Sequence, residues 1–194
     1  MKNIDLKPLT VITGNNFTGK TKLLKEIAKE TSGSKYINFN TEVEIKVTKW
    51  LKHWFRFIFR TKFKKGITNY ALRIIATGLN CKEGELLIVE NPEIVLHMRS
   101  ISYIAKFFTY LVASQGVRVV IETNSSDILN SICYEVLMKN INFEDVIFLH
   151  KADKNSIEKI FVNRSGKFVD KDSNLRKYPI GFFDANTKEI YALI

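Results

Sequence analysis

The sequence has 194 residues, of which 45% are hydrophobic and 26% charged, and these values are ordinary for a globular protein. We expect one domain over residues 1–194, because this length is typical of a chain with a single buried core. No uncharged apolar run is long enough to span a membrane and no secretory signal pattern is visible, so we expect a cytoplasmic protein. The net charge of +10 favours contact with polyanions.

Apolar periodicity predicts strands and helices that alternate along most of the chain. Short runs rich in β-branched residues predict the strands, and apolar residues at helical spacing predict the helices. We expect strands over residues 4–13, 36–39, 43–47, 85–90, 117–122, 146–150 and 157–162, and helices over residues 21–29, 48–60, 67–79, 93–114 and 126–138. This alternation is typical of an α/β fold, with a mainly parallel sheet and helices on both of its faces.

The segment between the first predicted strand and the first predicted helix reads GNNFTGKT and satisfies the pattern G-x-x-x-x-G-K-[ST]. In such a phosphate-binding loop, or P-loop, main-chain N–H groups surround the phosphates and the lysine reaches the β and γ phosphates. An incidental glycine-rich turn is the alternative, but the strand before and the helix after favour the P-loop. The sequence therefore predicts an ATP site that contains Gly14, Asn15, Asn16, Thr18, Gly19, Lys20 and Thr21.

A carboxylate ends a later apolar strand, where residues 86–90 read LLIVE. A P-loop needs such an acid at the end of a neighbouring strand, because it helps to hold the magnesium ion and its water shell. Thr21 and Glu90 are therefore the expected Mg²⁺ residues, and the fold is expected to be that of a P-loop NTPase.

Four further motifs follow in order: GITN at residues 66–69, ENPE at 90–93, ETNSSD at 122–127 and YPIGFFD at 178–184. Together with the P-loop they resemble the ABC-type ATPases of the SMC, RecF and OLD-nuclease group, in particular bacterial AAA-family ATPases with ENPE and ETHSD-like motifs. The resemblance implies an ABC-ATPase-like head with a truncated helical arm, residues 40–80 forming a short helical and signature subregion. It also implies an ATP-dependent, head-to-tail homodimer, in which Gly66, Thr68 and Asn69 contact the γ-phosphate of the opposite subunit. Such relatives act in DNA processing and anti-phage defence.

The hydrolytic positions depart from the pattern that the resemblance implies. Asn91 stands where a catalytic Glu usually follows the Mg²⁺ acid, and an amide can orient a water molecule but cannot take its proton. Glu93 is the remaining candidate base, although a first-turn acid can equally serve the helix dipole. Asn124 replaces the expected switch His, and the single glutamine, Gln115, leaves no Gln loop. ATP hydrolysis is therefore expected to be slow or partner-dependent.

Two other functions compete with a slow ATPase. The first is a non-hydrolysing, nucleotide-gated interaction module whose ATP state controls a separate effector protein. The second is a small-molecule kinase, which also uses a P-loop, but the ordered GITN, ENPE and ETNSSD segments argue against it.

A basic block with interleaved aromatic residues runs from Lys46 to Lys65 and contains no acid. Its cations and aromatic rings could neutralise the phosphates and stack on the bases of a nucleic acid. A basic amphipathic helix could also lie on an anionic membrane or on another protein. The third interpretation is a helix that buries its aromatic side chains and leaves its cations in water. We expect this block to face a polyanion or a protein partner.

Overall fold

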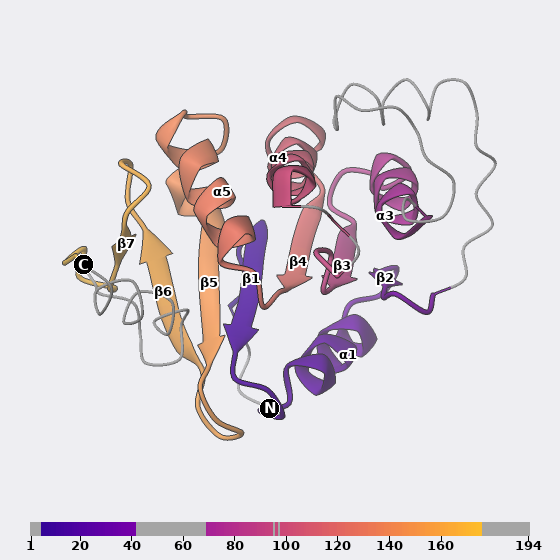
Figure 1. The fold of residues 1–194 in the computed structure, drawn as a ribbon, viewed down its shortest axis with the longest axis horizontal. Coiled ribbons are helices and arrows are strands. Elements are labelled where there is room, and N and C mark those ends of the chain that lie inside the picture. Colours follow the sequence, from indigo (N-terminus) through magenta and orange to yellow (C-terminus); the bar gives the residue numbers. More distant parts are fainter. Residues whose placement is uncertain (1–4, 42–68, 95, 97, 176–194) are drawn as a thin grey trace.

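The computed structural model describes residues 5–41, 69–94, 96 and 98–175 (Figure 1). Within these ranges the strands form one sheet in the order β2-β3-β4-β1-β5-β6-β7. The strands are β1 (Leu9–Gly14), β2 (Lys35–Ile37), β3 (Leu86–Glu90), β4 (Arg118–Glu122), β5 (Val146–Lys151), β6 (Glu158–Val162) and β7 (Phe168–Val169). The helices are α1 (Lys20–Glu30), α3 (Asn69–Leu79), α4 (Met98–Gln115), α5 (Ser126–Leu137) and the 3₁₀ turn η1 (Phe143–Asp145).

Five neighbouring strands of the sheet, from β2 to β5, run parallel to one another. The last two strands, β6 and β7, pair antiparallel at one edge. The α/β class and the mainly parallel sheet predicted from the sequence are therefore confirmed. Neither β7 nor the 3₁₀ turn was expected, because each is too short to carry a periodic signal.

Two buried apolar clusters cover the two faces of the sheet, as the alternation of side chains along a strand requires. Leu9 and Val11 of β1 belong to the larger cluster, which includes side chains of α3, α4 and α5. Ile12, one position further, belongs to the smaller cluster, which α1 covers with Leu23, Leu24 and Ile27. The helices thus lie on both faces of the sheet, as expected.

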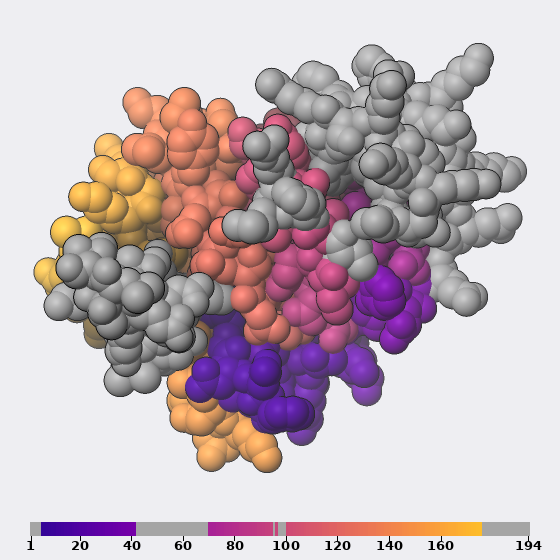
Figure 2. Space-filling model, in the orientation of Figure 1, coloured from indigo at the N-terminus to yellow at the C-terminus, as the bar shows by residue number. Residues whose placement is uncertain are grey.

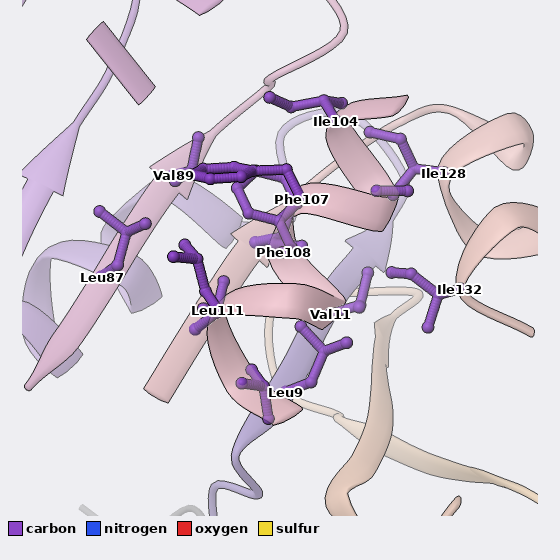
Figure 3. Close-up of a cluster of buried hydrophobic side chains, with 14 of the residues drawn as sticks. Leu9, Val11, Leu87, Val89, Ile104, Phe107, Phe108, Leu111, Ile128 and Ile132 are labelled. Atoms are coloured by element: carbon purple, nitrogen blue, oxygen red, sulfur yellow. The ribbon is translucent and has the colours of Figure 1, made fainter. Parts of the chain in front are cut away.

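Helix α4 supplies two of the largest side chains of the larger cluster, Phe107 and Phe108. Phe107, Phe108 and Leu111 are all buried and lie between the strands and the α5 residues Ile128 and Ile132 (Figure 3). Burying one such side chain contributes roughly 1.5–3 kcal/mol. This packing fixes the sheet against the helices, so the strand ends that carry the site residues have a firm support.

Two predicted elements begin later than expected. The first strand begins at Leu9 rather than residue 4, because Pro8 has no N–H for a sheet ladder and offers only its carbonyl, to the N–H of Val119. The long helix begins at Met98 rather than residue 93. Residues 92–94 form a turn instead, in which Ile94 N–H donates to Asn91 O at 3.1 Å.

Three predicted elements fall wholly or mainly outside the described residues. They are the strand at 43–47, the basic helix at 48–60 and most of the helical and signature subregion at 40–80. Within the described ranges, none of the helices is both long enough and apolar enough to cross a membrane.

Candidate functional site

The described residues of the P-loop, ENPE and ETNSSD motifs gather at one edge of the sheet, where the parallel strands β1, β3 and β4 end. Parallel α/β sheets bind ligands at this edge, because loops from several strands meet there. On the molecular surface, the indigo N-terminal segment adjoins the pink and orange segments of the middle of the chain (Figure 2). The site is therefore assembled from parts that are distant in the sequence.

The predicted phosphate loop connects β1 directly to α1. Gly14 ends the strand with φ 141°, and a Cβ there would lie 2.0 Å from the main-chain oxygen of Lys151. Asn15 holds the loop against the same neighbouring strand, since its N–H donates to Lys151 O at 3.2 Å and its side-chain amide to Ala152 O at 3.1 Å. Only a glycine permits this close approach of the loop to β5.

Thr18 is buried and bonded within the loop, and Gly19 provides its left-handed turn into α1. The Thr18 hydroxyl donates to Asn15 O at 2.9 Å, and Gly19 precedes the helix with φ 88°. Asn16 is exposed. Phe17 is also left in solvent, with 94% of its surface exposed and a left-handed φ of 63° that an aromatic residue rarely adopts.

Lys20 is the first residue of α1 and is only 5% exposed. Its ammonium group donates to Gly14 O at 2.8 Å and Asn15 O at 2.9 Å. It also lies 4.0 Å from Oε1 of Glu122. Burial lowers the pKa of Lys20, and the negative charge of Glu122 opposes that shift. A buried cation at the start of a helix is suited to bind an anion such as a phosphate.

Thr21 meets two carboxylates from neighbouring strands. Its hydroxyl donates to Glu90 Oε1 at 3.1 Å, and Glu122 Oε2 lies 3.5 Å away. Glu90 and Glu122 are register partners at the ends of β3 and β4. The sequence predicted Thr21 and Glu90 as Mg²⁺ residues, whereas Glu122 was not identified as a site residue.

Glu122 is 3% exposed, and burial raises its pKa to about 7, with the charges of Glu90 and Glu93 acting in the same direction. Lys20 is the cation that opposes this shift. Two adjacent carboxylates and a hydroxyl are hard oxygen donors of the kind that Mg²⁺ prefers. The donor set, crowded with negative charge, therefore fits a magnesium ion.

Glu90 is held from its other side by two tyrosines that sequence reasoning also missed. The Tyr36 hydroxyl of β2 donates to Glu90 Oε2 at 2.5 Å. The Tyr70 hydroxyl of α3 donates to the main-chain oxygen of Glu90. No local pattern marks either tyrosine, because their roles depend on the pairing of β2 with β3 and on the position of α3.

The three predicted catalytic residues lie together beside this centre. Oε1 of Glu93 accepts the N–H of Asn124 at 2.8 Å, and the side-chain amide of Asn124 donates to Asn91 Oδ1 at 3.3 Å. Asn91 has φ 46°, and its own N–H donates to Glu122 O at 2.8 Å. Burial raises the pKa of Glu93. The loops after β3 and β4 are thus joined through side chains.

The residues expected to contact the γ-phosphate of a second subunit are only partly placed. Gly66 and Thr68 lie outside the described residues, as does the basic block from Lys46 to Lys65. Asn69 begins α3.

A parallel sheet whose first strand passes through a G-x-x-x-x-G-K-[ST] loop into a helix has the fold of the P-loop NTPases. No family model matches the sequence, and no curated protein matches it. Among solved structures, the chain is similar to ATPases 2 and 3 of Thermomonospora curvata EccC in complex with a signal sequence peptide, with 15% identity and a TM-score of 0.39. The match covers 88% of this chain and 37% of that chain. A likeness this distant does not bear on what the chain binds.

Proposed function

We propose that the chain binds ATP with Mg²⁺ at the carboxyl edge of its sheet, and that it hydrolyses ATP slowly or only with a partner. The observation that carries this proposal is the hydrogen bond from Thr21 to Glu90. The two residues are 69 positions apart, and their contact pairs the P-loop with a strand-ending acid. Together with the buried Lys20 amine, it provides the groups that a magnesium nucleotide requires.

Each residue has a distinct role in this proposal. The loop N–H groups and Lys20 would bind the β and γ phosphates, while Thr21, Glu90 and Glu122 would hold the ion or its water shell. When bound, Mg²⁺ supplies positive charge that stabilises the phosphates. Asn91 and Asn124 would orient a water molecule by hydrogen bonds, and Glu93 would accept its proton.

Nucleotide-dependent stabilisation tests the proposal directly. ATP with Mg²⁺ should raise the melting temperature, because a ligand that binds only the folded state stabilises it by mass action. Lys20→Ala should abolish most of this shift. Lys22→Ala is the matched control, since Lys22 lies in the same helix with its side chain 82% exposed, and it should respond like the parent protein. An equal shift in the Lys20→Ala variant would exclude the P-loop as the binding site.

The resemblance to the ABC-type ATPases of the SMC, RecF and OLD group supports a further part of the proposal. ATP would join two copies head to tail, with Gly66, Thr68 and Asn69 of one copy near the γ-phosphate bound by the other. Light scattering with a non-hydrolysable ATP analogue tests the dimer. A monomer at saturating nucleotide would exclude it, and Gly66→Asp should suppress dimerisation while sparing nucleotide binding.

The context of such an ATPase is also a proposal. We favour DNA processing or anti-phage defence, with the block Lys46–Lys65 contacting nucleic acid, because eight cations and no acid fall within it. One observation favours the alternative of a nucleotide-gated module without turnover, acting on a separate effector. Asn91, which directly follows Glu90, cannot accept a proton, so in this proposal only Glu93 can act as the base for the attacking water.

A further inference from the structure

Both oxygens of the Glu90 carboxylate are engaged, and they face different elements of the fold. Oε1 accepts the hydroxyl of Thr21 at 3.1 Å, on the side of the P-loop. Oε2 accepts the hydroxyl of Tyr36 at 2.5 Å, on the side of β2. Because the two hydrogen bonds hold opposite ends of one planar group, rotation of the carboxylate would break one of them.

Tyr36 is placed for this contact by the sheet itself. It lies in β2, where it pairs with Ile88 of β3, two residues before Glu90. Its ring packs against the smaller apolar cluster. Burial and the neighbouring Glu90 raise the pKa of Tyr36, so its hydroxyl stays protonated and remains a donor at neutral pH.

A second tyrosine fixes the main chain of the same residue. Tyr70 is 1% exposed and its hydroxyl donates to Glu90 O. The Tyr70 ring contacts Phe39 edge to face, with ring centroids 5.9 Å apart, and the Arg73 guanidinium lies 5.5 Å from the Tyr70 ring centre. Glu90 is therefore supported at its carboxylate by β2 and at its backbone by α3.

An acid that helps to hold a metal ion needs partners of this kind, because hydrogen bonds to a ligand set its orientation and its basicity. The Tyr36 bond leaves Oε1 as the oxygen that faces Thr21. We propose that Tyr36 is a positioning residue, whose hydroxyl orients the Glu90 carboxylate toward the magnesium side of the nucleotide site. This inference rests on the proposed ATP and Mg²⁺ site.

The test is a magnesium titration of the full chain at saturating ATP, in which the melting temperature is measured at each Mg²⁺ concentration. Tyr36→Phe removes only the hydroxyl, and it should raise the Mg²⁺ concentration at half-maximal stabilisation by about tenfold. The stabilisation by ATP in the presence of EDTA should stay as in the parent protein. A purely structural tyrosine would lower the melting temperature equally with and without Mg²⁺.

Two comparison variants sharpen this result. Tyr134→Phe removes a hydroxyl from a half-exposed tyrosine of α5 and should titrate like the parent protein. In a Glu90→Gln background, Tyr36→Phe should cause no further change in the Mg²⁺ midpoint, because the positioned carboxylate is gone.

The outcomes separate the inference from the function on which it rests. If the parent protein shows no ATP-dependent shift at any Mg²⁺ concentration, the proposed function fails and the inference fails with it. If the parent protein responds to ATP and Mg²⁺ but Tyr36→Phe has an unchanged midpoint, only the inference is overturned.

If Tyr36→Phe does not fold, a measurement on a protein that keeps the hydroxyl tests whether Tyr36 is coupled to the Mg²⁺ site. With 3-fluorotyrosine at position 36, the ¹⁹F resonance should move when Mg²⁺ is added to the ATP-bound protein. A resonance that ignores Mg²⁺ would show that the tyrosine does not sense the ion site.

Discussion

The main-chain N–H of Asn124 donates to Oε1 of Glu93 at 2.8 Å, and this bond joins the loops that follow β4 and β3. The other carboxylate oxygen, Oε2, is buried and accepts no hydrogen bond from the described residues. Glu93 is therefore anchored at one oxygen, while the lone pairs of the other have no fixed donor in the part of the chain that the structure describes, as a general base requires. Its pKa, which burial raises, moves in the direction that favours proton uptake near neutral pH.

Replacing Glu93 by Gln should lower single-turnover ATP hydrolysis by a factor on the order of 10²–10⁴, because the amide cannot take a proton from water. Its effect on ATP binding should be small, since the amide oxygen can still accept the N–H of Asn124. Quenched-flow measurement of phosphate release checks the rate. A variant with parental turnover would leave Glu93 a structural residue, and a parent protein without turnover would favour the nucleotide-gated module.

Replacing Gly14 by Ala should destabilise the protein by about 3 kcal/mol, because the new Cβ would overlap the main-chain oxygen of Lys151 at 2.0 Å. Gly33→Ala is the control, since Gly33 also has a positive φ, 74° against 141° at Gly14, but nothing lies within 4 Å of its Cβ. It should cost only about 1 kcal/mol. Urea denaturation measures both values, and equal losses would show that the close approach to β5 has no energetic weight.

Replacing Phe17 by Asn should raise the free energy of unfolding by about 0.5–1 kcal/mol, because Asn tolerates the left-handed conformation better than an aromatic residue. Little burial is sacrificed, since Phe17 is 94% exposed. Phe39→Asn should instead lower stability, because Phe39 contacts the Tyr70 ring. A loss of stability in Phe17→Asn, measured by urea denaturation, would mean that the aromatic ring stabilises the loop.

The raised pKa of Glu122, about 7 against an ordinary 4.5, makes the stability of the nucleotide-free protein depend on pH. The folded state holds this proton more tightly than the unfolded state. The resulting stabilisation is complete below about pH 4.5 and is lost as the pH rises through 7, an effect on the order of 1–3 kcal/mol.

Glu122→Gln should remove this contribution, so its stability should fall less than that of the parent protein between about pH 5 and pH 8. Urea denaturation without metal or nucleotide measures the difference. Glu144→Gln, at an exposed position, should keep the parental dependence. If the Glu122→Gln variant tracks the parent across this range, Glu122 is ionised in the folded protein.

Replacing Arg56, Arg60, Lys62 and Lys64 by Gln tests the basic block. If these cations bind phosphates, the slope of log affinity for nucleic acid against log salt should flatten by roughly 0.7–0.9 for each phosphate that is no longer neutralised. The stabilisation by ATP should remain. Fluorescence anisotropy with labelled DNA and RNA at several salt concentrations gives the slopes, and identical slopes in parent and variant would assign the block to solvent or to a protein partner.

The sequence predicted the P-loop, Glu90 and the parallel sheet because each leaves a local pattern. GNNFTGKT has fixed spacing, and LLIVE is a continuous apolar run that ends in an acid. Helical periodicity alone predicted that the long helix begins at residue 93. The turn that contains Pro92 precedes α4, which begins at Met98. Periodicity does not show that Glu93 lies outside this helix and that its carboxylate accepts the N–H of Asn124 in the loop after β4.

The remaining site residues depend on distant contacts. Glu122 also ends an apolar strand, but such acids are common, and only its register beside Glu90 brings it to Thr21. Tyr36 and Tyr70 reach Glu90 through strand pairing and helix packing. A single sequence records neither relation, so these residues could be identified only from the fold.

The position of β1 in the sheet has a consequence for the order of folding. Its two neighbours are β4 and β5, which are made long after it during synthesis of the chain. Contacts between such distant segments are slow to form, because a long loop must close first. The hydrogen bonds from Asn15 to the carbonyls of Lys151 and Ala152 also cannot form before β5 has been synthesised. A nascent chain that has not yet extended past these residues therefore has no assembled phosphate loop, and nucleotide cannot stabilise it until then.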